Sequence, residues 1–165
     1  MSDYFFPKLQ TATALEPPRV QTTWSTGEVL VVDLGEILRK SAFLAQLLEP
    51  EVFARVHVGE HGCCLEWFDS EFGADNVYAW AKEQAGGVSH EMFGGWMYRN
   101  KLSLTDAATA LGISRRMVSY YRTAHKAIPR SIWLACLGWE ATRPKGRQLP
   151  YQLPTVNEYA FLQMA

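Results

Sequence analysis

Residues 102–122 constrain the fold of this chain most, because their spacing suits two short helices joined by a tight turn. Ser103 is placed to cap the first helix, with Asp106 three residues later as a partial capping box. An apolar helical stripe follows at Leu104, Ala107, Ala108 and Leu111. Gly112 stands where a helix ends in a left-handed residue, and Ser114 can cap the second helix.

The second helix has two unlike sides. Its buried side is predicted to carry Met117, Val118 and Tyr121. Its polar side presents Arg115, Arg116, Ser119, Tyr120 and Arg122. The sequence therefore predicts a helix that packs on one side and offers a basic, hydrogen-bonding surface on the other.

This pattern resembles the helix-turn-helix of the Cro and lambda-repressor superfamily of bacterial and phage regulators. The matching residues are Leu102, Ser103, Ala108, Leu111, Gly112, Ile113, Ser114, Val118 and Ser119, and Ile128-Pro129 resembles the entry into the family's next helix. The resemblance covers roughly residues 90 to 140 and implies an all-α domain that binds duplex DNA. One position departs from the family: it usually has glutamine one residue after the first cap, where it touches phosphate, and here that residue is Leu104.

The charges of the chain are divided unevenly between its two halves. Residues 1–87 hold 6 Lys and Arg against 13 Asp and Glu, a net charge of −7. Residues 88–147 hold 10 against 3, a net charge of +7, and a single Glu in the tail brings the total to −1. The basic half is the one with the two-helix pattern, so charge and motif both point to nucleic acid.

Specific side chains follow from this interpretation. A recognition helix enters the major groove with its capped N-terminus toward the DNA, so Ser114, Arg115, Arg116, Ser119 and Tyr120 are expected near base edges. Farther along the same helix, Arg122 and Lys126 are candidates for phosphate contacts. Four flanking residues are candidates for the same role: Arg99, Lys101, Thr105 and Arg130.

The first half, residues 1–87, reads as a small α+β domain. Strands are expected at 11–15, 19–24, 29–33, 55–58 and 63–67, short helices between 35 and 48 that end at Pro50, and a helix from Phe72 to Gln84. Gly86-Gly87 is the predicted boundary. Residues 8–80 resemble a small bacterial family of unknown function, on the segments Gly27 to Leu34, Leu47 to Val56 and the strand ending at Trp67. The resemblance implies a fold and no activity.

The second domain is predicted to span residues 88–165. Besides the two-helix motif, it should contain a helix from His90 to Arg99 and another from Arg130 to Leu137, with Gly138 as its stop. A short final helix is expected from about residue 156. Aromatic residues of that tail, Tyr159 and Phe161, are candidates for a dimer interface.

Metal and catalytic sites are weakly indicated. His57, His61, Cys63 and Cys64 crowd one hairpin, but adjacent cysteines in a strand point to opposite faces, so no metal site is expected. Glu66, Asp69, Glu71 and Asp75 are interpreted as a solvated acidic face. Since no phosphate-binding loop or nucleophile motif appears, we expect no cofactor and no enzymatic activity.

Composition sets the remaining expectations. The chain has no run of about 18 apolar residues and no basic leader, so neither a membrane span nor a secretory signal is expected. Three cysteines, two of them adjacent, form a poor disulfide framework and favour the cytoplasm.

The sequence as a whole predicts a two-domain α+β protein that binds double-stranded DNA as a homodimer and regulates transcription. An unknown effector or protein partner would act on the first domain. The alternative is a protein-interaction adaptor, or antitoxin-like module, whose two-helix motif contacts protein.

Overall fold

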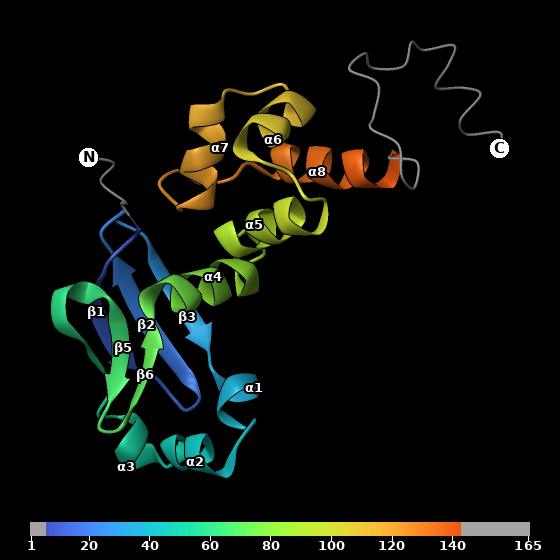
Figure 1. Ribbon diagram of the computed structural model, residues 1–165. Helices are drawn as coiled ribbons and strands as arrows, with labels where there is room; N and C mark the ends of the chain where they lie inside the picture. The colour runs from blue at the N-terminus through green and yellow to red at the C-terminus, as the bar shows by residue number, and fades with distance from the viewer. Residues whose placement is uncertain (1–5, 143–165) are drawn as a thin grey trace.

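The protein has an α+β fold, seen in a computed structural model that describes residues 6–142 (Figure 1). Its strands are β1 (Leu9–Ala14), β2 (Arg19–Trp24), β3 (Val29–Asp33), β4 (His57–Val58), β5 (Cys64–Trp67) and β6 (Ser70–Gly73). Its α-helices are α1 (Gly35–Leu38), α2 (Ala42–Ala45), α3 (Pro50–Phe53), α4 (Ala74–Gln84), α5 (His90–Arg99), α6 (Leu104–Leu111), α7 (Arg115–Arg122) and α8 (Arg130–Thr142). Two 3₁₀ turns, η1 (Gln46–Leu48) and η2 (Glu60–Gly62), complete the described elements.

The strands form two antiparallel sheets of three strands each, in the orders β1-β2-β3 and β4-β5-β6. Strand β1 also contacts β4 and β5, so the two sheets adjoin. The predicted bounds of β2 and β3 are confirmed, because both segments alternate β-favouring residues between clear turns. Trp24 and Val32 are fully buried on the inner side of the first sheet.

The predicted helix from Phe72 was wrong at its start. Residues 70–73 form β6 instead, paired to β5 through Trp67↔Ser70 and Leu65↔Phe72, and α4 begins only at Ala74. The pairing places Phe72 beside the Trp67 ring, with centroids 6.0 Å apart. A strand this short is stabilised by its neighbour across the hairpin, which local sequence periodicity does not reveal.

Two expected helix ends also need correction. Pro50 begins α3 as its first residue rather than only ending the preceding turns, a position where its missing N–H costs nothing. Gly138 does not stop α8, which continues to Thr142. Glycine lowers helix stability by about 1 kcal/mol, and the packing of Cys136 and Trp139 on either side outweighs that cost. The expected final helix and the residues Tyr159 and Phe161 lie outside the described residues.

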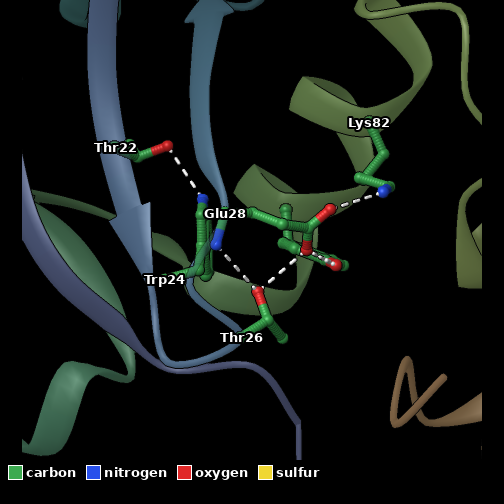
Figure 2. Close-up of polar contacts among 6 residues, drawn as sticks. Thr22, Trp24, Thr26, Glu28 and Lys82 are labelled. Carbon is green, nitrogen blue, oxygen red and sulfur yellow. Dashed lines mark hydrogen bonds and ion pairs between the residues drawn. The ribbon is translucent and has the colours of Figure 1, made fainter. Parts of the chain in front are cut away.

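Helix α4 joins the strands to the helical half (Figure 1). It contacts β3, β5 and β6, so it covers both sheets. Figure 2 shows the polar side of this contact, where the Glu28 carboxylate lies 2.7 Å from Lys82 Nζ. Tyr78 and Thr26 also donate hydrogen bonds to the same carboxylate. Burial raises the pKa of Glu28, but these hydrogen bonds and the lysine charge outweigh it and hold the pKa below its usual value.

The far end of α4 is fixed to β3 by a pair of backbone contacts. Gln84 Oε1 accepts a hydrogen bond from Asp33 N (2.7 Å), and Gln84 Nε2 donates one to Asp33 O (2.8 Å). Asp33 itself accepts from Gly35 N at the start of α1. The backbone N–H and C=O of Asp33 are therefore both hydrogen-bonded within the chain, and its carboxylate stabilises the turn into α1.

The buried apolar residues form two clusters. One combines the sheets with α1–α4, and the other combines α5–α8 around Phe93, Trp96 and Val118. Ala124 packs in the first cluster although it lies between α7 and α8, two helices of the second. The boundary at Gly86-Gly87 remains a prediction.

The buried side chain of His90 lies where the two clusters meet. Its ring is 4.9 Å from that of Phe6 and 6.4 Å from that of Tyr78. Neither ring nitrogen has a hydrogen-bond partner among residues 6–142, and Glu91 Oε1 is 3.6 Å from Nε2. Burial lowers the pKa of His90 despite the opposing charges of Glu91, Asp75 and Glu83.

Within residues 6–142, no helix is long and apolar enough to cross a membrane.

We expect Glu28→Gln to destabilise the protein by about 1–3 kcal/mol in urea unfolding at pH 7, because it removes the charged acceptor of three donors. The carboxylate has a lowered pKa in the folded state, so its contribution should be lost as the pH falls below about 4.5. Glu16→Gln is the matched control, since that exposed carboxylate is 3.9 Å from Arg19, and its cost should stay below about 0.5 kcal/mol. Equal effects of the two substitutions would contradict the role of Glu28.

His90→Gln should flatten the dependence of stability on pH. The unfolded chain binds a proton at His90 near pH 6.5, whereas the folded chain resists it, so the wild type loses stability as the pH falls from 7.5 to 5.5. The loss can reach about 1.4 kcal/mol per pH unit. Urea unfolding across this range tests it, and an unchanged profile in the variant would assign the effect to other groups.

A fragment that begins at residue 88 tests the predicted boundary. Because the second cluster has its own buried residues, we expect helical circular dichroism and a cooperative thermal transition. The melting temperature should lie below that of the full chain, because Ala124 and His90 lose their packing against the first half. A fragment without a cooperative transition would show that the boundary is wrong.

Candidate functional site

Helices α6 and α7 form the two-helix unit expected from residues 102–122. Ser103 Oγ accepts a hydrogen bond from Asp106 N (3.1 Å), and the Asp106 carboxylate accepts one from Ser103 N (3.1 Å), so the capping box is complete. The hydrogen bonds from Ser103 hold the pKa of Asp106 below its usual value. Gly112 ends α6 with φ of 67°, in the left-handed region where glycine is favoured.

The turn between the helices fixes their angle. Ile113 N donates to Ala108 O (3.0 Å), which folds the chain back over the end of α6. Ala107, Ala108 and Val118 are buried where the two helices meet. The small alanines let the helix backbones approach closely, so α7 is held on its apolar side with its other side outward.

The N-terminus of α7 is capped and basic. Ser114 Oγ accepts from Met117 N (3.2 Å), and the exposed Arg115 and Arg116 follow as the first two helical residues. No acidic side chain lies in the first turn of α7, all of whose residues the structure describes. The positive end of the helix dipole and two guanidinium groups therefore act together, which favours an anion at this point.

The two arginines differ in how they are held. Arg116 Nε donates to Tyr120 OH (2.5 Å), and its guanidinium carbon lies 5.4 Å from the centre of the Tyr120 ring. That ring in turn lies 4.5 Å from the ring of His125. Among residues 6–142, no hydrogen bond or ion pair engages the side chain of Arg115. Arg116 is thus preoriented along the helix, whereas Arg115 is free to turn toward a ligand.

The remaining candidates of the recognition helix, Ser119, Arg122 and Lys126, do not all lie on α7. Ser119 is half-buried and Arg122 is exposed, and both line an open groove of about 490 Å³ between α5, α6 and α7. Lys126 was expected on the recognition helix, but α7 ends at Arg122 and Lys126 is in the loop to α8. Ala124 adopts a left-handed φ of 53° in that loop, beyond the end of α7. Alanine rarely adopts this conformation, so the sequence does not indicate that the helix ends there.

The flanking candidates also differ in availability. Arg99 donates to both carboxylate oxygens of Glu140 on α8, at 3.3 and 3.2 Å, so its guanidinium already has an anionic partner. The arginine holds the pKa of Glu140 below its usual value. Lys101, Thr105 and Arg130 are exposed: Lys101 just before α6, Thr105 in its first turn and Arg130 at the start of α8.

Two features of this surface escaped the sequence-based prediction. Tyr120 was chosen for base contact, yet its hydroxyl is occupied by Arg116, a pairing that the four-residue spacing on a helix could have suggested. Tyr98 on α5 is 87% exposed and lines the groove beside Leu104. Its exposure depends on how α5 packs against α7, and no local pattern encodes that.

Comparison with known proteins gives one detailed result. No family model and no curated protein matches the chain. A crystal structure from Nitrosomonas europaea ATCC 19718, named "Putative DNA Binding Protein", matches with 72% sequence identity and a TM-score of 0.82. The match covers 94% of this chain and 100% of the other.

Proposed function

The chain belongs to the same family as the Nitrosomonas europaea protein, and from that relationship and the geometry of α7 we propose that it binds double-stranded DNA. The observation that carries the proposal is the exposed, capped and basic N-terminus of α7, with no acid in its first turn. The net charge of +7 over residues 88–147 supports it, because phosphate contacts supply most of the affinity of such proteins.

In the proposed complex, α7 is the recognition helix of a helix-turn-helix similar to that of the lambda-repressor superfamily. It lies in the major groove, and α6 crosses the phosphate backbone. Arg115 reads a base edge, most simply guanine O6 and N7 through two parallel hydrogen bonds. Arg116, held by Tyr120, presents a fixed charge beside it.

The remaining exposed groups position the protein on the backbone. Thr105 follows the capped start of α6. Lys101, Lys126 and Arg130 flank the two-helix unit with cationic groups that can donate hydrogen bonds to phosphate oxygens. Leu104 takes the place of a phosphate-binding glutamine, and its side chain packs against the second cluster instead. Backbone affinity therefore rests on these cations and on the N-terminus of α7.

We propose further that the protein regulates transcription as a homodimer. One such module covers a short site, and a two-fold dimer would read two half-sites about one helical turn apart. If about six phosphates per dimer are neutralised, the logarithm of the binding constant should fall with that of the salt concentration with a slope of about −5. The role assigned to the chain is binding rather than catalysis.

The double variant Arg115→Ala, Arg116→Ala tests the recognition helix. A duplex selected from a random library by the wild type serves as ligand, and fluorescence anisotropy measures affinity at several salt concentrations. We expect the preference for that duplex over random DNA to disappear, since each good arginine–guanine pair contributes about 1–3 kcal/mol of discrimination. The melting temperature should change little, because both side chains are exposed.

The matched control is Arg39→Ala, Lys40→Ala, which removes two adjacent exposed cations between α1 and α2. It should leave both affinity and preference nearly unchanged. If the recognition variant keeps its sequence preference, α7 is not the reading helix. If the wild type binds random and selected duplex equally weakly and without salt dependence, the unit contacts protein instead of DNA.

A further inference from the structure

Four potential metal ligands share one face of the small sheet β4-β5-β6, far along the chain from α7. His57 on β4 pairs with Glu66 on β5, and Glu66 pairs with Glu71 on β6, so these three side chains form a row across the strands. Cys64 precedes Glu66 by two residues on β5, and the two-residue period of a strand puts both on the same face.

The ligand atoms lie close together. One atom each from Cys64, Glu66 and Glu71 can be chosen so that all lie within 4.8 Å of one another. Cys64 Sγ is 3.0 Å from Glu66 Oε1, and the other oxygen of that carboxylate is 3.3 Å from His57 Nε2. Ligands around a tetrahedral zinc ion are about 3.3–3.7 Å apart, given bond lengths of about 2.0–2.3 Å. The distances from the Glu66 carboxylate to Cys64 and to His57 are close to that spacing.

His57 is oriented in the manner of a metal ligand. Its Nδ1 donates to the backbone carbonyl of Arg55 (3.2 Å), and a carbonyl can only accept, so the proton of this contact belongs to Nδ1. With Nδ1 in this contact, Nε2 is the nitrogen left to bind a metal, and it is the one that faces Glu66. Ligating histidines almost always bind a backbone carbonyl or carboxylate through their second nitrogen in this way.

Gly59 closes the cluster from the side of the connection between β4 and β5. A Cβ at this position would overlap both the Glu66 carboxylate and Cys64 Sγ. Gly59 N also donates to Cys64 O (2.9 Å), which holds the backbone against the ligand atoms. The absence of a side chain at residue 59 therefore leaves room for the cluster to form.

We propose that Cys64, Glu66, Glu71 and His57 bind one divalent ion of the zinc class. A thiol, an imidazole and two carboxylates are ligands that zinc accepts together, whereas calcium and magnesium require oxygen alone. On binding, the Cys64 thiol releases its proton to solvent and the thiolate bonds to the metal. Among the described residues, Cys64, Glu66 and Glu71 are the one group of potential ligands this close together, and His57 adjoins the group through Glu66.

The exposed Cys63 is not part of this site. The strand expected from residue 63 begins only at Cys64; Cys63 ends the turn η2 and is exposed, whereas Cys64 is buried, with the two sulfurs 3.6 Å apart. From the sequence, no metal site is expected if these two cysteines must act as a pair. The pairing of the strands instead joins one of them to carboxylates from β5 and β6.

The test uses the full chain without an affinity tag, treated with a chelator and kept reduced. Isothermal titration calorimetry with zinc chloride should give one ion per chain, and the melting temperature should rise with zinc. Cobalt(II) should give a thiolate-to-metal charge-transfer band in the near ultraviolet. Cys64→Ser should abolish that band, and Glu71→Gln should weaken binding by about tenfold or more.

Cys63→Ser and Asp69→Asn are the matched controls, a neighbouring thiol and a neighbouring exposed acid outside the cluster. Both should bind zinc as the wild type does. Glu71 is exposed, so its substitution should leave the fold intact even if Cys64→Ser does not. Unchanged zinc affinity in Glu71→Gln, a charge-transfer band that depends on Cys63, or no binding by the wild type below millimolar zinc would overturn the proposal.

Discussion

The contact between Glu28 and helix α4 is the constraint on which the arrangement of the two halves depends. Lys82 and Tyr78 come from successive turns of α4, and both bind one carboxylate at the start of β3. Gln84 repeats the attachment at the other end of the strand. A helix fixed at two points along a strand cannot slide or rotate freely. Its C-terminus, where the chain leaves for α5, therefore has a defined position relative to both sheets.

That position is carried into the helical half by direct contacts. Ser89, which caps α5, donates to Glu83 on α4, and His90 packs its ring against Phe6 and Tyr78. Ala124 extends the first apolar cluster to the end of α7. The candidate recognition helix is thus attached to the strand half near its C-terminus, while its basic N-terminus points away from that attachment. A ligand or partner that altered the first half could act on α7 through these residues.

Elements stabilised by neighbouring residues were predictable from the sequence. The caps Ser103 and Ser114, the left-handed Gly112 and the strand β2 all follow from local chemistry, and the structure has them as expected. Contacts between distant segments were not predictable: β6 depends on its partner β5, and Arg99 finds Glu140 forty-one residues away. Lys126 is not on α7 as predicted, because the helix ends before Ala124, which adopts a left-handed conformation more usual for glycine. The roles of Arg115 and Arg116 in DNA recognition remain predictions.

The same distinction explains why identical residue types acquire different roles. Arg115 and Arg116 are adjacent, carry the same charge and are both exposed, yet only Arg116 stands four residues before Tyr120 on the helix. The Arg116 side chain is therefore restricted by its contacts with Tyr120, whereas that of Arg115 keeps its conformational freedom. Cys63 and Cys64 also differ, because β5 begins only at Cys64: Cys63 ends the preceding turn and is exposed, whereas the Cys64 thiol donates to Glu66. In both pairs, the position of each residue in its element decides which neighbour its side chain meets, and that neighbour decides the chemistry.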